Sequence, residues 1–266
     1  MKVLIVGYGN MGKTYANSFI SSRFIKSEDI FVLVRNENFS TPESSIPKIN
    51  FSHLLTEKIS DFDIVILAVK PQDFGTLAMT LKPYLKDSQI IFSVMAGITL
   101  TKLSSQLSCS KIVRSMPNIP TQIGMGMTVF TASTNVDRKE LFIIQNLINT
   151  TGKSVYVENE KLIDAATAIS GSGPAYVFYF MQSLIRAAVD LGFNESEAEL
   201  LVNQTFMGSV AIQNSYSLSN EELIKKVASK GGTTESALHV FEKGNLEQTI
   251  IEAVKAANDR ALELGS

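Results

Sequence analysis

The sequence has few of the side chains that most often carry metal or nucleophilic chemistry. Its one cysteine is Cys109, so no disulfide can form within the chain, which fits a reducing compartment. The two histidines, His53 and His239, have no companions at ligand spacing, and Cys109 has no acid or base motif beside it. We therefore expect no metal site, and we interpret all three residues as structural.

Long hydrophobic runs and an excess of one charge are also missing. The longest apolar runs, AYVFYFM and IVILAV, fall well short of the ~20 residues of a membrane-spanning helix. The stretch MKVLIVGYGN is too short and too broken by glycine to be a signal peptide. A net charge of −2 gives no general attraction for nucleic acid. We expect a soluble cytoplasmic protein that binds neither membranes nor nucleic acid.

What is present is an ordinary globular composition, with 45% apolar and 19% charged residues among 266. In the first half of the chain, strand patterns alternate with helix patterns. The strands are predicted at 2–6, 29–34, 63–69, 89–95, 111–116, 126–132 and 154–157. The helices are predicted at 11–22, 77–85 and 99–107. This alternation predicts a doubly wound α/β domain with a mainly parallel sheet.

The pattern changes after about residue 158. The remaining helices are predicted at 161–169, 174–191, 195–214, 219–228, 233–243 and 245–264. We predict two domains, an α/β domain over 1–158 and an all-helical domain over 159–266. The helix after Pro174 is apolar on more than one face, which is typical of a buried helix. So few helical residues form a limited core, and we expect a partner chain to cover part of it.

The stretch VGYGNMG places Gly7, Gly9 and Gly12 between the first predicted strand and the first predicted helix. Gly7 would allow the tight turn, Gly9 would let a diphosphate approach the backbone, and Gly12 would let the helix pack closely on the strand. The diphosphate would then lie at the helix N-terminus. This context favours dinucleotide binding; a plain strand-to-helix turn is the alternative.

Arg35 and Asn36 follow the second predicted strand, where an NAD-binding domain normally has an acidic residue for the ribose 2′-hydroxyl. An arginine there can pair with a 2′-phosphate, which favours NADP. The alternative is a solvated arginine at a strand end. The segment that follows, 36–47, leaves little room for the usual second helix.

Three turns follow successive predicted parallel strands, VKPQ at 69–72, AGIT at 96–99 and MPNIP at 116–120. Each alone is a routine loop signal. Because ligands bind beyond the carboxyl ends of parallel strands, the three turns together with the glycines outline a cofactor crevice.

In its order of motifs the chain resembles the pyrroline-5-carboxylate reductases over nearly its whole length. The motifs are VGYGNMG, ILAVKPQ, SVMAGIT, VRSMPNIPTQIGMGMT, DAATAISGSGPAYVF and SKGGTTESAL. The resemblance implies a Rossmann-type domain followed by a helical dimerisation domain, in a homodimer that often assembles further. It also implies that NADPH, and in some members NADH, reduces 1-pyrroline-5-carboxylate to L-proline in the final step of proline biosynthesis.

The resemblance also implies roles for residues at matching positions. The expected diphosphate ligands are Gly7, Gly9, Asn10, Met11 and Gly12, and the expected 2′-phosphate ligands are Arg35 and Asn36. The expected lining of the ribose and nicotinamide side is Val69, Lys70, Pro71 and Ala96, with Asn118 and Pro120 in the same crevice. The expected substrate-carboxylate loop is Ser229, Lys230, Gly231, Gly232, Thr233 and Thr234. Thr234 is the expected catalytic residue, with its hydroxyl at the ring nitrogen.

A second glycine-rich helix start supports a site in the helical domain. The stretch SGSGPAY, with Ser172 and Gly173, is expected to face the nicotinamide and the substrate, although a well-capped core helix would explain Pro174 equally well. The later start, SKGGTTESA, offers backbone amides to an anion. Lys230 stands where the family most often has proline; it adds a charge but removes a fixed φ.

Two other interpretations remain at this point. One is a reductase of the same fold that acts on a different small cyclic imine or a 2-oxo acid. The other is a non-catalytic relative that binds a nucleotide or a protein partner. The intact SGSGPAY and GGTTE stretches favour an enzyme.

Overall fold

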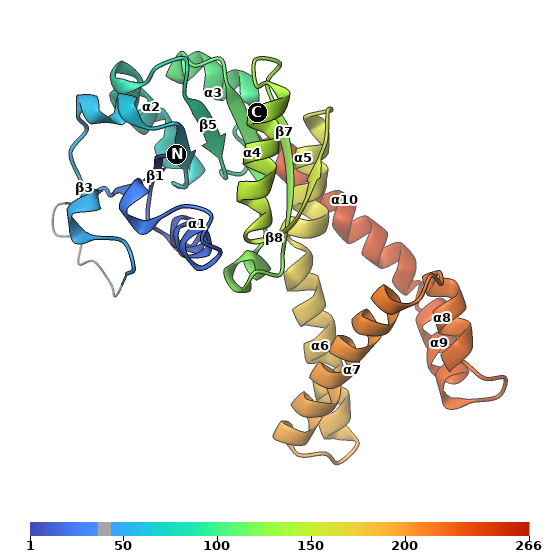
Figure 1. The fold of residues 1–266 in the computed structure, drawn as a ribbon. Coiled ribbons are helices and arrows are strands. Elements are labelled where there is room, and N and C mark those ends of the chain that lie inside the picture. The colour runs from blue at the N-terminus through green and yellow to red at the C-terminus, as the bar shows by residue number, and fades with distance from the viewer. Residues whose placement is uncertain (37–43, 266) are drawn as a thin grey trace. The chain divides into compact units, whose positions relative to one another are not determined.

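The computed structural model describes residues 1–36 and 44–265 and divides them into two compact units (Figure 1). The first unit contains one eight-stranded sheet in the order β3-β2-β1-β4-β5-β6-β7-β8. All neighbouring strands are parallel except the antiparallel pair β6 and β7. The strands are β1 Val3–Val6, β2 Ile30–Leu33, β3 Phe51–Ser52, β4 Ile64–Leu67, β5 Ile90–Ser93, β6 Ile112–Met116, β7 Gly126–Ala132 and β8 Gly152–Tyr156.

Helices cover both faces of this sheet. They are α1 Asn10–Ser21, α2 Phe74–Leu81, α3 Leu100–Leu107, α4 Arg138–Asn149 and α5 Lys161–Ala166, the last followed by a π-helical turn over Thr167–Gly171. Alternate residues of β1 face opposite sides, so Val3 and Ile5 pack in the core under α1 and α4, and Leu4 packs in the core under α2 and α3. Burial of both faces explains the continuous Val and Ile runs in these strands.

The structure confirms the predicted α/β class with an N-terminal doubly wound sheet. Each of the seven predicted strands is present. Helix α4 is absent from the predictions, although its signals are in the sequence. Asp137 and Glu140 form a capping box at its start, and Ile144 and Ile148 recur at helical spacing on its buried face.

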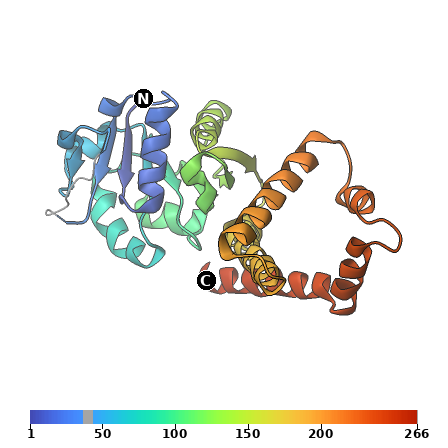
Figure 2. The ribbon, with the colours of Figure 1, turned by 90° about the horizontal axis from the view of Figure 1, so that it is seen from below.

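The second unit, Gly173–Ala256, is helical. Its helices are α6 Gly173–Asp190, α7 Glu195–Ser215, α8 Asn220–Val227, α9 Thr233–Lys243 and the first part of α10 Leu246–Gly265 (Figure 2). These helices confirm the predicted helical second half. By packing, the chain divides at Ser172, because α5 contacts β6 and β7, and residues from Ala257 onward return to the sheet unit. The domain boundary between 158 and 159 stays a prediction.

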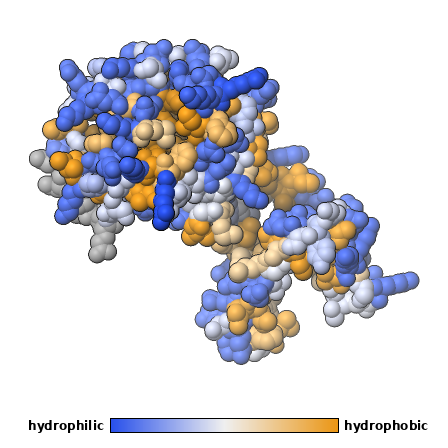
Figure 3. Space-filling view, viewed as in Figure 1, coloured by the Kyte–Doolittle hydropathy of each residue, from blue (hydrophilic) through white to orange (hydrophobic). Residues whose placement is uncertain are grey.

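The helical unit buries little of its apolar surface in a single chain. Among its described residues only Ala198 and Val202 are buried, and no residue of α6 is. Phe180 packs against Phe206 and Phe241, with ring centroids 6.1 and 6.5 Å apart. Apolar side chains remain on the surface of this unit (Figure 3). Such extensive exposure is typical of a surface that another chain covers.

No helix in the described residues combines the length and the low polarity that crossing a membrane requires.

Candidate functional site

The turn between β1 and α1 depends on two of its three glycines. Gly7 has φ of +95°, and a Cβ there would lie 2.7 Å from the Ala68 carbonyl oxygen. A Cβ at Gly12 would overlap the Gly7 carbonyl oxygen. At Gly9, by contrast, a Cβ would meet no atom within 4 Å. The fold therefore requires glycine at 7 and 12, whereas Gly9 leaves open space beside the backbone that a ligand can approach.

Helix α1 begins directly after Gly9 and presents free donors. The first hydrogen bond within the helix joins the Lys13 amide to the Gly9 carbonyl oxygen, 3.0 Å apart. The preceding amides, those of Asn10, Met11 and Gly12, have no acceptor in the described residues, and the first turn contains no acidic residue. This start of a 12-residue helix is suited to an anion such as a diphosphate.

The same stretch, GYGNMGKT, also has the spacing of a P-loop, G-x-x-x-x-G-K-T. The geometry is different, because the helix already begins at Asn10 rather than at the lysine. The Thr14 hydroxyl donates to the Asn10 carbonyl oxygen at 2.8 Å, and the Lys13 amine lies 5.8 Å from the centroid of the Tyr8 ring. The turn therefore fits a dinucleotide rather than a nucleoside triphosphate with its magnesium ion.

Arg35 and Asn36 follow the carboxyl end of β2, which is beside the carboxyl end of β1 where the glycine turn begins. Residues 37–43, which come next, lie outside the described residues. The Arg35 side chain is 84% exposed, and its Nη1 atom lies 3.6 Å from Oδ1 of Asp73. Both side chains line a cavity of about 250 Å³. The other lining residues are Val6, Gly7, Leu33, Val34, Val69, Thr76, Leu77 and Thr80. A cation therefore faces the space beyond the ends of β1, β2 and β4.

The predicted residues on the nicotinamide side follow β4 and β5. Val69 and Ala96 are half-buried, while Lys70 and Pro71 are exposed at the start of a short 3-10 turn, Pro71–Asp73. Because β4 and β5 are parallel neighbours, their carboxyl ends bring these turns to one edge of the sheet, as the sequence predicts.

Asn118 lies after β6 and uses both ends of its side-chain amide within the protein. Its Nδ2 atom donates to the Ser170 carbonyl oxygen at 3.0 Å, and its Oδ1 atom accepts from the Met127 amide at 2.9 Å. These bonds join the turn after β6 to the start of β7 and to the π-helical turn. Contact between Asn118 and a cofactor stays a prediction. The two bonds show that Asn118 holds the turn after β6 in place against its neighbours.

The π-helical turn leads directly into the SGSG stretch. The Ser172 amide donates to the Thr167 carbonyl oxygen at 2.8 Å, and α6 begins at Gly173 with Pro174 in its first turn. A Cβ on Gly171 would lie 2.8 Å from the terminal methyl of Met116, so the turn packs closely on the end of β6. Single π-turns of this kind are frequent at functional sites.

Sequence reasoning missed the charged group behind this turn. Arg114 on β6 is 1% exposed and bonds to Glu160 at 2.9 Å and to Asp164 at 2.5 Å. Glu160 also accepts from the Leu100 amide at the start of α3, 2.8 Å away. This cluster fixes α5, and therefore the π-helical turn, against the sheet. A basic residue inside the apolar run KIVRSM was the available signal.

In the helical unit, the predicted substrate loop ends at the start of α9. Gly231 has φ of +74°, and its amide donates to the Glu235 carboxylate at 2.7 Å. A Cβ on Gly232 would lie 2.6 Å from the Ser229 hydroxyl oxygen. The first helical bond is from Ser236 to Gly232, which leaves the amides of Thr233, Thr234 and Glu235 without acceptors in the described residues. The loop thus offers a second set of amides to an anion.

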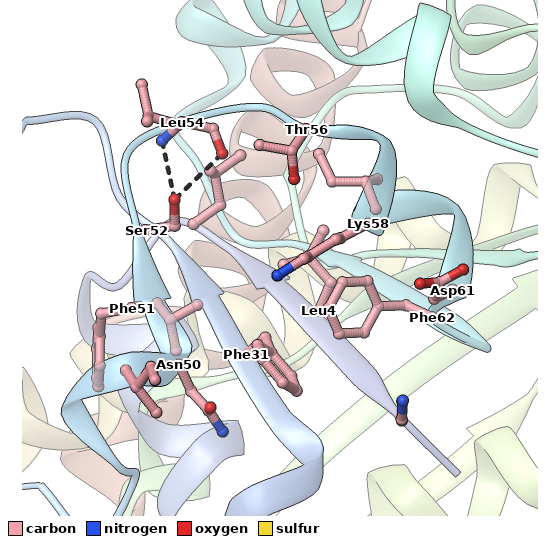
Figure 4. Close-up of a pocket in the computed structure, with 15 residues that line it drawn as sticks. Leu4, Phe31, Asn50, Phe51, Ser52, Leu54, Thr56, Lys58, Asp61 and Phe62 are labelled. Atoms are coloured by element: carbon pink, nitrogen blue, oxygen red, sulfur yellow. Dashed lines mark hydrogen bonds between the residues drawn. The ribbon is translucent and has the colours of Figure 1, made fainter.

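A cavity of about 560 Å³ lies apart from all the predicted residues (Figure 4). Leu4, Phe31 and Phe62 form an apolar wall, and the Lys58 side chain extends beside it. The hydrogen bonds drawn there are local, between Ser52 and the backbone of Leu54. Among the described residues, no group of three His, Cys, Asp or Glu side chains could hold a metal ion.

Two family models match the chain. One is described as pyrroline-5-carboxylate reductase dimerisation and matches residues 160–264, which supports oligomerisation. The other is described as NADP oxidoreductase, coenzyme F420-dependent, and matches residues 2–97.

Similar proteins span nearly all of the chain. The pyrroline-5-carboxylate reductase of Aquifex aeolicus is 34% identical over 99% of this chain and 97% of its own. Pyrroline carboxylate reductase of Plasmodium falciparum, solved with NADP bound, has a TM-score of 0.88 at 31% identity and covers 100% of this chain and 98% of its own. The Coxiella burnetii enzyme also has a TM-score of 0.88, at 30% identity and the same coverage. This chain therefore belongs to the pyrroline-5-carboxylate reductase family.

Proposed function

We propose that the chain reduces 1-pyrroline-5-carboxylate to L-proline with NADPH, and with NADH to a lesser extent, as the final step of proline biosynthesis. The observation that carries the proposal is a pair of glycine-rich helix starts, α1 after Gly9 and α9 after Gly232, each with three backbone amides that find no acceptor among the residues that the structure describes. The reaction needs two anions to be held, the diphosphate of the cofactor and the carboxylate of the substrate, and the chain provides one helix start for each.

The residues of the sheet unit fit a dinucleotide. Gly9 leaves space beside the start of α1, and Arg35 supplies a cation for a 2′-phosphate next to the cavity at the ends of β1, β2 and β4. Val69, Lys70, Pro71 and Ala96 would line the ribose and nicotinamide side. When bound, the reduced nicotinamide supplies a hydride to the imine carbon of the substrate.

The loop before α9 would hold the substrate. Ser229, Lys230 and the amides that follow would bind the carboxylate, with the Lys230 ammonium adding attraction in place of a rigid proline. Ser172 and Gly173 would border the ring, where small residues leave space. The Thr234 hydroxyl would orient the ring nitrogen or relay a proton from solvent to it, so that the imine becomes an iminium ion, which gains the hydride at its carbon and leaves the secondary amine of proline. Because an iminium ion is already activated, positioning and charge complementarity supply most of the rate enhancement.

We also propose that the chain acts as a homodimer through its helical unit, with further assembly of dimers. The exposed apolar side chains of α6 and α7 support this arrangement. A cytoplasmic location belongs to the proposal, and the single buried cysteine agrees with a reducing compartment.

The test is the loss of nicotinamide absorbance when the purified chain is mixed with NADPH and 1-pyrroline-5-carboxylate, repeated with NADH. Rapid oxidation that falls sharply in Thr234→Ala, with NADPH binding retained, supports the proposal. If NADPH binds but no oxidation follows, the substrate assignment fails. A panel of other cyclic imines and 2-oxo acids then separates a reductase with different specificity from a non-catalytic relative, and Lys230→Pro tests the departure in the loop.

A further inference from the structure

The Asp73 carboxylate takes no part in a helix cap. Asp73 ends the turn Pro71–Asp73, and α2 begins at the next residue, Phe74. Its backbone is helical, with φ of −86° and ψ of −13°, so it continues the turn into α2 and lacks the extended conformation of a capping residue. Its side chain makes no capping hydrogen bond. Its carboxylate faces Arg35, with Oδ1 3.6 Å from Nη1.

The Asp73 carboxylate is therefore beside the cation that the proposed function assigns to the 2′-phosphate. Asp73 and Arg35 line the same cavity of about 250 Å³, together with Gly7 of the glycine turn and Val69 after β4. In a doubly wound sheet, this space beyond β1 and β2 receives the adenosine end of a dinucleotide. Asp73 thus follows β4, Arg35 follows β2, and the two side chains lie close together at the adenosine end. NADPH and NADH differ there in the ribose 2′ substituent.

The two cofactors place opposite demands on this pair. A ribose 2′-phosphate is doubly or nearly doubly negative, so it attracts Arg35 and is repelled by a carboxylate a few ångströms away. A ribose 2′-hydroxyl is neutral and can donate a hydrogen bond to a carboxylate, which is how NAD-binding domains hold it. The described residues place both elements in one cavity, a cation for the phosphate and a carboxylate for the hydroxyl.

We propose that Asp73 is a specificity-determining residue that lowers the preference for NADPH over NADH. It competes with the 2′-phosphate for the Arg35 guanidinium and repels that phosphate, but it does not oppose NADH, whose 2′-hydroxyl is neutral. Asparagine at position 73 would keep an acceptor oxygen for that hydroxyl. This inference rests on the proposed function for the identity of the cofactors but not for the substrate.

The test is the dissociation constant of each cofactor, measured from nicotinamide fluorescence without substrate, in the parent chain and in Asp73→Asn. The substitution keeps the shape and removes the charge. We expect the constant for NADPH to fall roughly 2- to 10-fold and that for NADH to change less than about 2-fold, as suits one partly solvated charge contact. In Arg35→Gln, the constant for NADPH rises and that for NADH changes little.

A salt series and a matched control variant distinguish an effect of the Asp73 charge from a structural effect of the substitution. Raising KCl from about 50 to about 500 mM should shrink the gap between the parent and Asp73→Asn for NADPH, because salt screens exposed charges. Asp61→Asn is the control. Asp61 is exposed, lies before the amino-terminal end of β4, whereas Asp73 follows the carboxyl end, and lines the cavity of Figure 4. It removes the same charge and should leave both constants unchanged.

Several outcomes overturn the inference. If Asp73→Asn binds NADPH more weakly, Asp73 positions Arg35 rather than opposing the phosphate. If neither constant changes, or Asp61→Asn has the same effect, Asp73 has no specific role. A parent chain that binds neither cofactor overturns both this inference and the proposed function. A parent chain that binds both cofactors without reducing 1-pyrroline-5-carboxylate refutes only the proposed function, and the comparison of constants still decides the role of Asp73.

Discussion

The side-chain amide of Asn118 donates to the Ser170 carbonyl oxygen at 3.0 Å, which ties the turn after β6 to the π-helical turn before α6. Its other end accepts from the Met127 amide at 2.9 Å. One residue therefore joins its own turn to the start of β7, nine positions away, and to the π-helical turn, 52 positions away. The arrangement gives the expected nicotinamide side of the site a fixed support rather than a free loop.

Substitutions at Asn118 should show whether this residue holds the turns in place or binds the cofactor. In Asn118→Ala the Met127 amide loses its acceptor, and we expect a loss of about 1–3 kcal/mol in the free energy of unfolding. Asn118→Asp keeps an acceptor for Met127 but no donor for Ser170. If positioning is the task, kcat should fall in both variants while the dissociation constant for NADPH changes little. A rise in that constant with kcat unchanged would instead identify Asn118 as a cofactor ligand.

Arg114→Met should destabilise the sheet unit strongly. The substitution leaves the Glu160 and Asp164 carboxylates without their buried partner, and breaking such a cluster costs about 3–5 kcal/mol. The measurement is urea unfolding at a fixed protein concentration. Neutralising the acids as well, in Arg114→Met with Glu160→Gln and Asp164→Asn, should recover much of the loss. Equal stability of the single and triple variants would mean that uncompensated charge is not the cause.

The glycine turn provides a matched pair of substitutions. Gly12→Ala places a methyl group against the Gly7 carbonyl oxygen, so we expect a lower melting temperature and poor folding. Gly9→Ala meets no protein atom, so the fold should persist while NADPH binding weakens at least about 10-fold, because the methyl group occupies ligand space. Circular dichroism and cofactor titration check the two expectations. Intact binding in Gly9→Ala would place the diphosphate elsewhere.

Cys109 should be unreactive in the native chain. Burial, with a smaller effect of the Asp87 charge, raises the pKa of the thiol from 9.0 to about 11. The thiol therefore stays protonated at pH 8, where alkylation by iodoacetamide should be slow until denaturant is added. Because the folded-state pKa is raised, the stability that depends on the neutral thiol is complete below pH 9.0 and is lost as the pH rises toward 11. Rapid alkylation of the folded chain at pH 8 would contradict this burial.

If the chain dimerises through its helical unit, a charged residue introduced on the apolar surface of that unit should lower the mass of the assembly. Tyr179 on α6 is 78% exposed in the single chain, and Tyr179→Glu should shift the mass measured by light scattering toward a monomer. Phe142 on α4 is 65% exposed in the sheet unit, so Phe142→Glu is a control that should leave the mass unchanged. A mass that responds only to Phe142→Glu would place the interface on the sheet unit.

The sequence was sufficient for the central strands β1, β4 and β5, because they are buried on both faces and read as uninterrupted runs such as IVIL in β4. The two-residue strand β3, Phe51–Ser52, was not predicted, because it is too short to form such a run. Helix α4 was missed although its signals are local. Arg114 could not have been paired from the sequence, because Glu160 and Asp164 lie 46 and 50 positions away. Likewise, the motif around Asn118 indicated a crevice, but only the folded backbone shows that both ends of its amide are already engaged.

The strand order has a consequence for how the chain is made. β1 leaves the ribosome before both of its neighbours, β2 and β4. Its second partner therefore appears only after residues 64–67 have been synthesised. Until then one side of an almost wholly apolar strand has no hydrogen-bonding partner, a condition that slows folding and favours aggregation. Pauses in translation before β4 should therefore lower the yield of folded protein more than pauses after it.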